Sequence, residues 1–280
     1  MDQIVIQEGL PVGVVCEVLK VSRSGFYAYQ SKGLSQREAR DEELMPLIRE
    51  IFWEHKRRYG ARRVAQELAA QGERCGVARV AKLLEKQGLK AIQPKSYRPR
   101  TTNSRHCLGY SPNLLIGRDA PTKIDEVWVG DITYIALRGG RFGYLSVLMD
   151  LYSRRIVGWE YQESMTADLV LASLQKAIRQ RQPGAHLIHH SDRGGQYAAG
   201  DYRAVLSRAQ MAQSMSDADN CYDNAFMESC FGTIKRELEL VEYIDSLEAV
   251  RELSDYLHYY NHQRRHSSLG YLTPAEFESQ

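Results

Sequence analysis

The second half of the chain carries a hydrophobic pattern that predicts a mixed sheet surrounded by helices. From residue 127 onward, apolar and polar residues first alternate with a period of two, as in strands, and apolar residues later recur at helical spacing. The pair Gly139-Gly140 predicts a hairpin between the first two strands. Three consecutive strands followed by strands that alternate with helices indicate an α/β fold. The predicted strands are 127–136, 142–150, 154–162, 186–190 and 212–215, and the predicted helices are 167–181, 201–209 and 223–238.

The first 90 residues show helical periodicity, which predicts a small all-α domain. Residues 12–30 predict a helix, a turn and a second helix, as in many helix-turn-helix units, and further helices are predicted at 37–54, 60–70 and 77–87. In the last of these, one face is apolar and the opposite face is basic. The basic face either contacts DNA or is simply solvated, and the pattern leaves both open. The apolar face holds Val77, Val80 and Leu84, and the basic face holds Arg79, Lys82 and Lys86.

Between the two halves lies a basic stretch, residues 91–118, that has no acidic residue and contains prolines at positions 94, 99 and 112. Because proline disfavours helix, we expect an extended segment. Its arginines, Arg98 and Arg100 among them, alternate with tyrosines, a composition that suits contact with a phosphate backbone. A plain tether between two domains is the alternative interpretation.

A last helix is predicted after Asp245, which we expect to cap it together with Glu248. Its apolar stripe should pack on the α/β domain. The stripe consists of Val250, Leu253, Leu257 and Tyr260.

Charge separates the two halves of the chain. Residues 1–110 hold 20 Lys and Arg against 12 Asp and Glu, whereas residues 111–280 hold 17 against 23. A basic first half and an acidic second half suggest nucleic-acid binding in front and a metal-holding region behind, although solvated surface helices would explain either half alone.

Cysteines and hydropathy exclude several classes of protein. The five cysteines are an odd number without a C-x-x-C pair, which argues against a disulfide framework or a cysteine-based zinc site. No segment approaches the ~20 uncharged apolar residues of a membrane span, and no secretory signal is visible. We therefore expect a cytoplasmic protein with no membrane partner.

Three acidic residues stand at positions where a site would form. Asp131 lies within a predicted strand, Asp192 at the carboxyl end of another, and Glu228 on a helix, with 35 residues between the last two. A single acidic residue in a strand is usually a hydrogen-bonded structural one. Three that converge repel each other unless a divalent cation neutralises them, so the set implies Mg²⁺ or Mn²⁺. We assign Asp150 a structural role, and the adjacent His189 and His190 should face opposite sides of their strand.

These residues sit in motifs that resemble a known family. The motifs are Trp128 to Ile135, His190 to Tyr197, Glu228 followed seven residues later by Lys235, and the tail from Tyr260 to Pro274. Together they resemble the DDE transposases of bacterial insertion sequence family three, relatives of retroviral integrases, and specifically the product of their second reading frame (OrfB). The spacing is that family's D, D(35)E and E-x6-K pattern, and the resemblance covers essentially the whole chain.

The resemblance implies an RNase H-like fold and a DDE transposase that cleaves DNA and transfers strands with two metal ions, Mg²⁺ or Mn²⁺. Asp131, Asp192 and Glu228 would be both the catalytic residues and the metal ligands. Lys235, Arg264 and His266 would contact DNA, as would the basic helix face and the linker arginines. We expect four parts: a helix-turn-helix-like region at 1–90, a basic linker at 91–120, the catalytic core at 121–240, and a C-terminal helix and tail at 241–280 packed on that core.

The expected partners are the DNA of the element ends and of the target, and further copies of this chain on that DNA. Residues 1–60 contain no sustained heptad of apolar residues. The family supplies a coiled coil and another helix-turn-helix through a frameshifted fusion with the upstream reading frame, so we also expect the OrfA product as a partner.

Two other classes share parts of this pattern. A metal-dependent nuclease without strand transfer would not need the basic amino-terminal domain. A non-catalytic DNA-binding regulator would not need three acidic residues together with Lys235.

Overall fold

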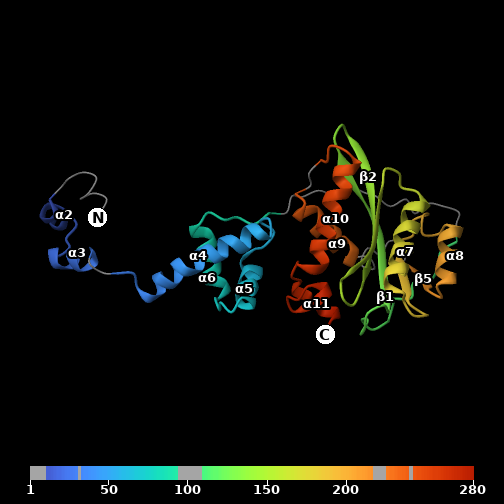
Figure 1. The fold of residues 1–280 in the computed structure, drawn as a ribbon, viewed down its shortest axis with the longest axis horizontal. Helices are drawn as coiled ribbons and strands as arrows, with labels where there is room; N and C mark the ends of the chain where they lie inside the picture. Colours follow the sequence, from blue (N-terminus) through green and yellow to red (C-terminus); the bar gives the residue numbers. More distant parts are fainter. Residues whose placement is uncertain (1–10, 31–32, 94–108, 217–224, 240–241) are drawn as a thin grey trace. The chain divides into compact units, whose positions relative to one another are not determined.

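The structure is a computed structural model that describes residues 11–30, 33–93, 109–216, 225–239 and 242–280. The chain forms two compact units, residues 1–91 and 92–280. Figure 1 labels their helices and strands. The helices and strands that the sequence predicts are all present, and their ends differ from the predicted ones by a few residues at most.

The first unit is helical. Its helices are α2 (Val12–Val18), α3 (Arg23–Gln30), α4 (Gln36–Glu54), α5 (Ala61–Ala70) and α6 (Val77–Lys86). A capping box between Ser35 and Glu38 begins α4, and α4, α5 and α6 pack against one another. Val77, predicted to lie in the core, is 42% exposed, because the buried face of α6 instead includes Leu83. The fully buried residues at the centre are Leu44, Ile48, Val64, Leu68 and Val80.

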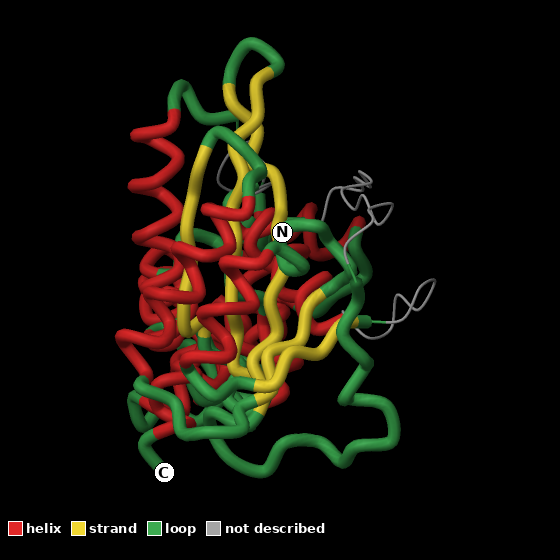
Figure 2. The backbone as a smooth tube through the Cα atoms, turned by 90° about the vertical axis from the view of Figure 1, so that its right-hand side faces the viewer, coloured by secondary structure: helices red, strands yellow, loops and turns green. Residues whose placement is uncertain are grey.

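The second unit is built on a five-stranded mixed sheet in the order β3-β2-β1-β4-β5. The two hairpin-connected pairs are antiparallel, while β4 runs parallel to both β1 and β5. Gly139 and Gly140 both adopt positive φ at the β1–β2 turn, which favours glycine there. Figure 2 shows the strands side by side with a pronounced twist. The strands are β1 (Val127–Leu137), β2 (Arg141–Asp150), β3 (Ile156–Gln162), β4 (Ile188–Ser191) and β5 (Ala212–Met215).

Helices cover both faces of this sheet, as the pattern predicted (Figure 1). On one face, α7 (Ala167–Arg181) packs on β2 and β3, and α8 (Gly200–Arg208) packs on β5. On the other lie α9 (Ala225–Glu237), α10 (Ser246–His262) and α11 (Pro274–Glu278), of which α9 contacts β1 and α10 contacts β1 and β3. This is an RNase H-like arrangement.

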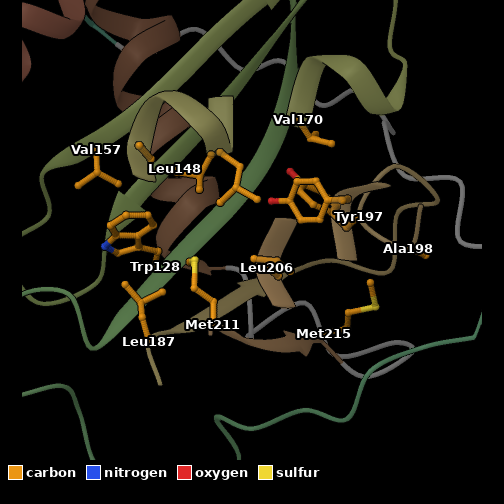
Figure 3. Close-up of a cluster of buried hydrophobic side chains, with 13 residues drawn as sticks. Trp128, Leu148, Val157, Val170, Leu187, Tyr197, Ala198, Leu206, Met211 and Met215 are labelled. Atoms are coloured by element: carbon orange, nitrogen blue, oxygen red, sulfur yellow. The ribbon is translucent and has the colours of Figure 1, made fainter. Parts of the chain in front are cut away.

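The core between the sheet and α7 and α8 is apolar and tightly packed (Figure 3). Trp128, Leu148 and Leu174 are completely buried within it. Gly158 lets α7 approach the sheet, since a Cβ atom there would lie 2.5 Å from the Ser173 carbonyl oxygen. The sheet and α7 are therefore held at a separation that leaves little room for added atoms.

Helix α10 packs on the sheet through much of the predicted stripe. Leu253, Leu257 and Tyr260 are buried, but Val250 is 38% exposed, because Ala249 takes the inward position at that turn. The Asp245 carboxylate accepts a hydrogen bond from the Glu248 amide at 2.9 Å, as predicted. Glu248 in turn accepts the Ile244 amide at 2.6 Å.

Cys16, Cys75 and Cys230 are free thiols, and the other two cysteines lie outside the described residues. Over the part of the chain that the structure describes, no helix combines the length and the apolar character needed to cross a membrane.

Candidate active site

Asp131 and Asp192 lie on neighbouring strands at the same level of the sheet. Gly130 of β1 pairs with Ser191 of β4, and β4 ends there. The next residue of each chain segment is an aspartate, so the parallel register brings the two aspartates side by side, where β1 continues beyond the end of β4 and stays paired with β2. Both side chains are half-buried. The site therefore sits at a carboxyl strand end, where ligand and catalytic groups commonly gather.

The turn after β4 fixes the Asp192 carboxylate. Its Oδ1 accepts a hydrogen bond from the Gly194 amide at 3.0 Å. A Cβ atom at position 194 would lie 2.9 Å from that same oxygen, so only glycine fits without a shift. The adjacent Arg193 donates through Nε to the Ser216 carbonyl at 2.7 Å, which ties the turn to the end of β5.

Tyr197 is a buried tyrosine close enough to both aspartates to be influenced by their charges. It is 1% exposed, and its pKa is raised well above 10.0, first by burial and then by the negative charges of Asp131 and Asp192. Both carboxylates thus influence the pKa of the same phenol, so both lie near it, as the register of β1 and β4 indicates.

Glu228 lies in the first turn of α9, a helix that packs beside β1. Its side chain is exposed, whereas its neighbours Met227 and Cys230 are buried. Among the described residues, no group of three or more His, Cys, Asp or Glu side chains is placed to hold a metal ion. The structure therefore brings Asp131 and Asp192 together, but Glu228 does not complete a ligand group with them.

Lys235, two turns after Glu228, reaches β1. Its Nζ lies 3.9 Å from the centre of the Tyr134 ring, a cation–π contact. Burial lowers the pKa of Lys235 to about 8, and the opposing influence is the negative charge of Asp131. The ammonium group is therefore close to the site, as well as being partly desolvated.

The two histidines of β4 serve structural contacts. The His189 Nε2 lies 2.9 Å from the Tyr202 hydroxyl on α8, and the His190 Nδ1 lies 2.8 Å from the Ser214 hydroxyl on β5. Asp150, at the far end of β2, is fully buried and accepts backbone hydrogen bonds from Asp125, Tyr152 and Ser153. These bonds fit the structural role that the sequence suggested for Asp150.

Arg264 and His266, which we predicted to contact DNA, are buried, at 4% and 7% exposure. Arg264 forms a two-pronged ion pair with Glu237 of α9, and its Nη1 lies 3.5 Å or less from the His266 ring nitrogens. The Arg264 guanidinium is buried and already bound to Glu237, so it has no surface through which to contact a phosphate. The sequence reasoning missed Glu237, the acidic partner, since nothing in the pattern marks it as buried.

The basic face of α6 is largely paired within its own unit. Arg79 donates to Asp41 at 2.6 Å and to the Arg37 carbonyl at 2.9 Å, and the Lys86 Nζ lies 3.3 Å from Glu42. Lys82 is exposed. Arg98 and Arg100 lie outside the described residues. For these five residues, DNA contact stays a prediction.

A second basic surface was not predicted from the sequence. Lys56 and Arg57, in the turn after α4, and Arg62, in the first turn of α5, are all exposed. Lys56 and Arg57 have φ of 49° and 62°, an uncommon left-handed pair for residues other than glycine. We call these three residues the basic turn. In the sequence, the consecutive cations Lys56 and Arg57 are the feature that could have indicated the basic turn.

The described end of the basic linker packs on the sheet. The Leu114 amide donates to the Ser214 hydroxyl at 2.9 Å, and the Ser111 hydroxyl donates to Gln213 at 2.8 Å. The Tyr110 ring lies 4.9 Å from the Arg193 guanidinium. A free tether does not describe residues 109–118, because they line β5 and the turn that carries Asp192.

Known proteins resemble this chain over most of its length. Models described as "Integrase core domain" match residues 121–221 and 209–274, and one described as "HTH-like domain" matches residues 39–97. The chain is 42% identical to an uncharacterized 31 kDa protein of insertion element IS600 from Shigella sonnei, over 94% of this chain and 97% of that protein. It is 38% identical to the transposase InsF for insertion sequence IS3A from Escherichia coli strain K12, over 98% of this chain and 96% of that protein. A chain of a simian T-cell lymphotropic virus intasome has a TM-score of 0.49 at 15% identity, over 77% of this chain and 70% of that one.

Proposed function

Since this chain belongs to the IS3-family insertion-sequence transposases, which are polynucleotidyl transferases, we propose that Asp131, Asp192 and Glu228 are its catalytic carboxylates. The observation that carries the proposal is the parallel register of β1 and β4, in which the two aspartates follow a paired glycine and serine. An aspartate with a purely structural role would not need a second carboxylate on the neighbouring strand.

The position of α9 supports the inclusion of Glu228. Phe226, at the start of α9, contacts Arg154 near the β2–β3 connection, and Lys235, near its end, contacts Tyr134. The helix therefore runs in the same direction as β1. Seven helical residues and three strand residues both span about 10 Å, and we infer from this that Glu228 begins near the level of Asp131.

The donor set suits a divalent metal. Carboxylate oxygens are the ligands that Mg²⁺ and Mn²⁺ prefer, and two adjacent half-buried carboxylates repel each other without a counter-charge. Asp131 and Asp192 would hold the metal, with Glu228 as the third ligand and two ions in the complete site. When bound, such ions activate an attacking oxygen and stabilise the leaving oxygen of a phosphodiester.

The side chains of this chain then bind and orient the DNA. The ammonium group of Lys235, close to Asp131, would contact a phosphate next to the scissile one. The reaction has two stages: water cleaves one strand at an element end, and the freed 3′-hydroxyl attacks another phosphodiester. Both are direct displacements at phosphorus, so no side chain needs to form a covalent intermediate.

The DNA partners would be held by the helical unit and the linker. The cations Lys56, Arg57, Arg62 and Lys82 of that unit are exposed, so phosphates can reach them from solvent. Arg98 and Arg100 would extend this contact. We further propose that two or more copies assemble on paired element ends, and that the OrfA product or a fusion with it adds end specificity.

The acid triad makes the first testable prediction. Asp131→Asn, Asp192→Asn and Glu228→Gln should each abolish cleavage and joining, with DNA binding retained, because each removes one charged oxygen donor and little volume. The assay incubates purified protein with labelled element-end DNA and Mg²⁺ or Mn²⁺ and resolves nicked from joined products. Asp150→Asn is the control for loss of a buried structural carboxylate, which should lower the melting temperature.

Each outcome of this assay separates the functional classes. A variant that cuts at a rate near the parent's removes that residue from the site. Nicked products without joined ones, from the parent under all conditions, would indicate a nuclease. Binding without either product would indicate a DNA-binding regulator.

A further inference from the structure

Helix α9 carries Glu228 in its first turn and Lys235 in its last, so its placement decides where both side chains lie. The helix packs beside β1 through an apolar stripe that includes Met227 and Ile234, both fully buried. Apolar contacts are non-directional, and such a stripe tolerates a small slide or rotation of the helix. Directional contacts at the helix ends are needed to fix its axial position.

At the C-terminal end, such a contact is made by Arg264 from the tail. Its Nε and Nη2 both donate to the Glu237 carboxylate, at 3.0 and 2.8 Å, and the two side chains are 4% and 2% exposed. The Tyr256 hydroxyl of α10 donates to the same carboxylate at 3.1 Å. A planar guanidinium that binds a carboxylate through two bonds fixes both distance and orientation.

At the N-terminal end, Arg154 makes the corresponding contact. It follows β2, and its guanidinium lies 4.2 Å from the centre of the Phe226 ring, two residues before Glu228. Its amide donates to the Asp150 carbonyl at 2.9 Å, which anchors it to the sheet. Its Nη1 is buried and has no hydrogen-bond partner among the described residues. Asp150 and Tyr260 interact electrostatically with the guanidinium, and the Phe226 ring adds a cation–π contact.

We propose that Arg154 and Arg264 are positioning residues for the reaction: they hold the two ends of α9 and thereby determine where Glu228 and Lys235 lie relative to the two aspartates. This inference rests on the proposed role of Glu228. It assigns to the tail signature around Arg264 a structural task in the site, in place of DNA contact. Neither arginine touches the reacting groups itself.

The chain provides a matched control for each arginine. Arg181 forms a two-pronged pair with Asp125, at 3.0 Å for both bonds, and ties α7 to the segment before β1. Arg155 is the immediate neighbour of Arg154 and binds Glu278 of α11 at 2.5 Å. Among the described contacts, neither control residue meets α9. Loss of either should cost stability without moving Glu228.

The test compares Arg264→Lys with Arg181→Lys, and Arg154→Met with Arg155→Met, in the full chain. Calorimetric titration with Mn²⁺ in the absence of DNA gives metal affinity independently of activity. For Arg264→Lys and Arg154→Met we expect a loss of about tenfold or more in Mn²⁺ affinity and in cleavage, with end-DNA affinity within about twofold of the parent's. The two controls should keep the parent's Mn²⁺ affinity and show only a lower melting temperature.

Two further variants keep the result decisive. Arg154→Lys retains a cation over the Phe226 ring and should recover most of the Mn²⁺ affinity that Arg154→Met loses, even if Arg264→Lys fails to fold. Glu228→Gln tests the premise. If it binds Mn²⁺ as the parent does, the proposed function of Glu228 is wrong. If it loses affinity while both arginine variants behave like their controls, only the positioning role is overturned.

Discussion

Buried ionisable groups show at the scale of single residues how the site is supported. His189 of β4 is fully buried, and burial lowers its pKa to about 3, with His190 adding to the effect. The neutral ring lies beside the rings of Tyr197 and Tyr202, and its Nε2 lies 2.9 Å from the Tyr202 hydroxyl. The strand that precedes Asp192 therefore contains a buried imidazole that is neutral in the folded state at neutral pH.

This makes stability depend on pH in a definite direction. Above the ordinary pKa of 6.5, His189 is neutral in both states and contributes no pH dependence. Below it, the unfolded chain takes up a proton that the folded chain refuses, so the free energy of unfolding falls by about 1.4 kcal/mol per pH unit until about pH 3. Urea unfolding from pH 7 to pH 4 should therefore show a shallower decline for His189→Gln than for the parent. The exposed His258→Gln is the control, and a parallel decline for all three proteins would contradict this account.

Lys235 gives a second residue-scale prediction. If its ammonium contacts one phosphate, Lys235→Ala should weaken end-DNA binding and reduce the slope of log affinity against log salt by roughly one unit. Lys235→Arg keeps the charge and should keep the slope. Fluorescence anisotropy across a salt series measures both quantities. An unchanged slope in Lys235→Ala would mean that the lysine only packs on Tyr134.

At the scale of elements, the fit of α7 on the sheet is tested by Gly158. A Cβ atom there would lie 2.5 Å from the Ser173 carbonyl oxygen and 2.8 Å from the Ala177 Cβ. Gly158→Ala should therefore destabilise the protein by about 1–3 kcal/mol, the usual cost of overpacking. Gly184→Ala is the control, because nothing lies within 4 Å of its added Cβ atom. Equal denaturation midpoints for the two variants would show that α7 moves aside freely.

The same scale shows what the sequence could predict and why the rest escaped it. Periodicity located the helices and strands, because the α/β core imposes regular burial on them, and α7 was predicted with both ends correct. Periodicity did not locate partners across elements. Arg264 and Glu237 are 27 residues apart and both look solvent-exposed by composition, so their burial as a pair follows only from the packing of the tail on α9. Likewise, the sequence pattern puts Arg79 on an exposed basic face, and only the structure shows its ion pair with Asp41.

For the candidate site, spacing and motif singled out both aspartates, and the register of β1 and β4 places them on neighbouring strands; their catalytic role stays a proposal. The placement of Glu228 could not be predicted from spacing alone. It depends on the axial position of α9, which side chains distant in sequence determine.

At the scale of the whole molecule, the proposed DNA-binding and metal-binding residues lie in different compact units, and the proposed division of tasks is testable in the full chain. The basic turn belongs to the first unit and the acidic site to the second, so DNA affinity and metal affinity should respond to different substitutions. The triple variant Lys56→Ala, Arg57→Ala, Arg62→Ala should lower end-DNA affinity and reduce the salt slope by roughly two to three units, at about 0.9 for each phosphate that is no longer neutralised. Its Mn²⁺ affinity, measured by calorimetry, should equal the parent's.

The control for that variant removes a cation that already has acidic partners in the same unit. Arg40 binds both Glu43 and Glu73, so Arg40→Ala removes one positive charge without a phosphate contact and should leave the salt slope unchanged. A reduced slope in Arg40→Ala would mean that the field of the unit as a whole attracts DNA. A triple variant with the parent's slope would exclude the basic turn and return the predicted contact to Lys82 and the linker arginines. Since counterion release scales with the number of phosphates neutralised, the slope distinguishes these cases where a single affinity cannot.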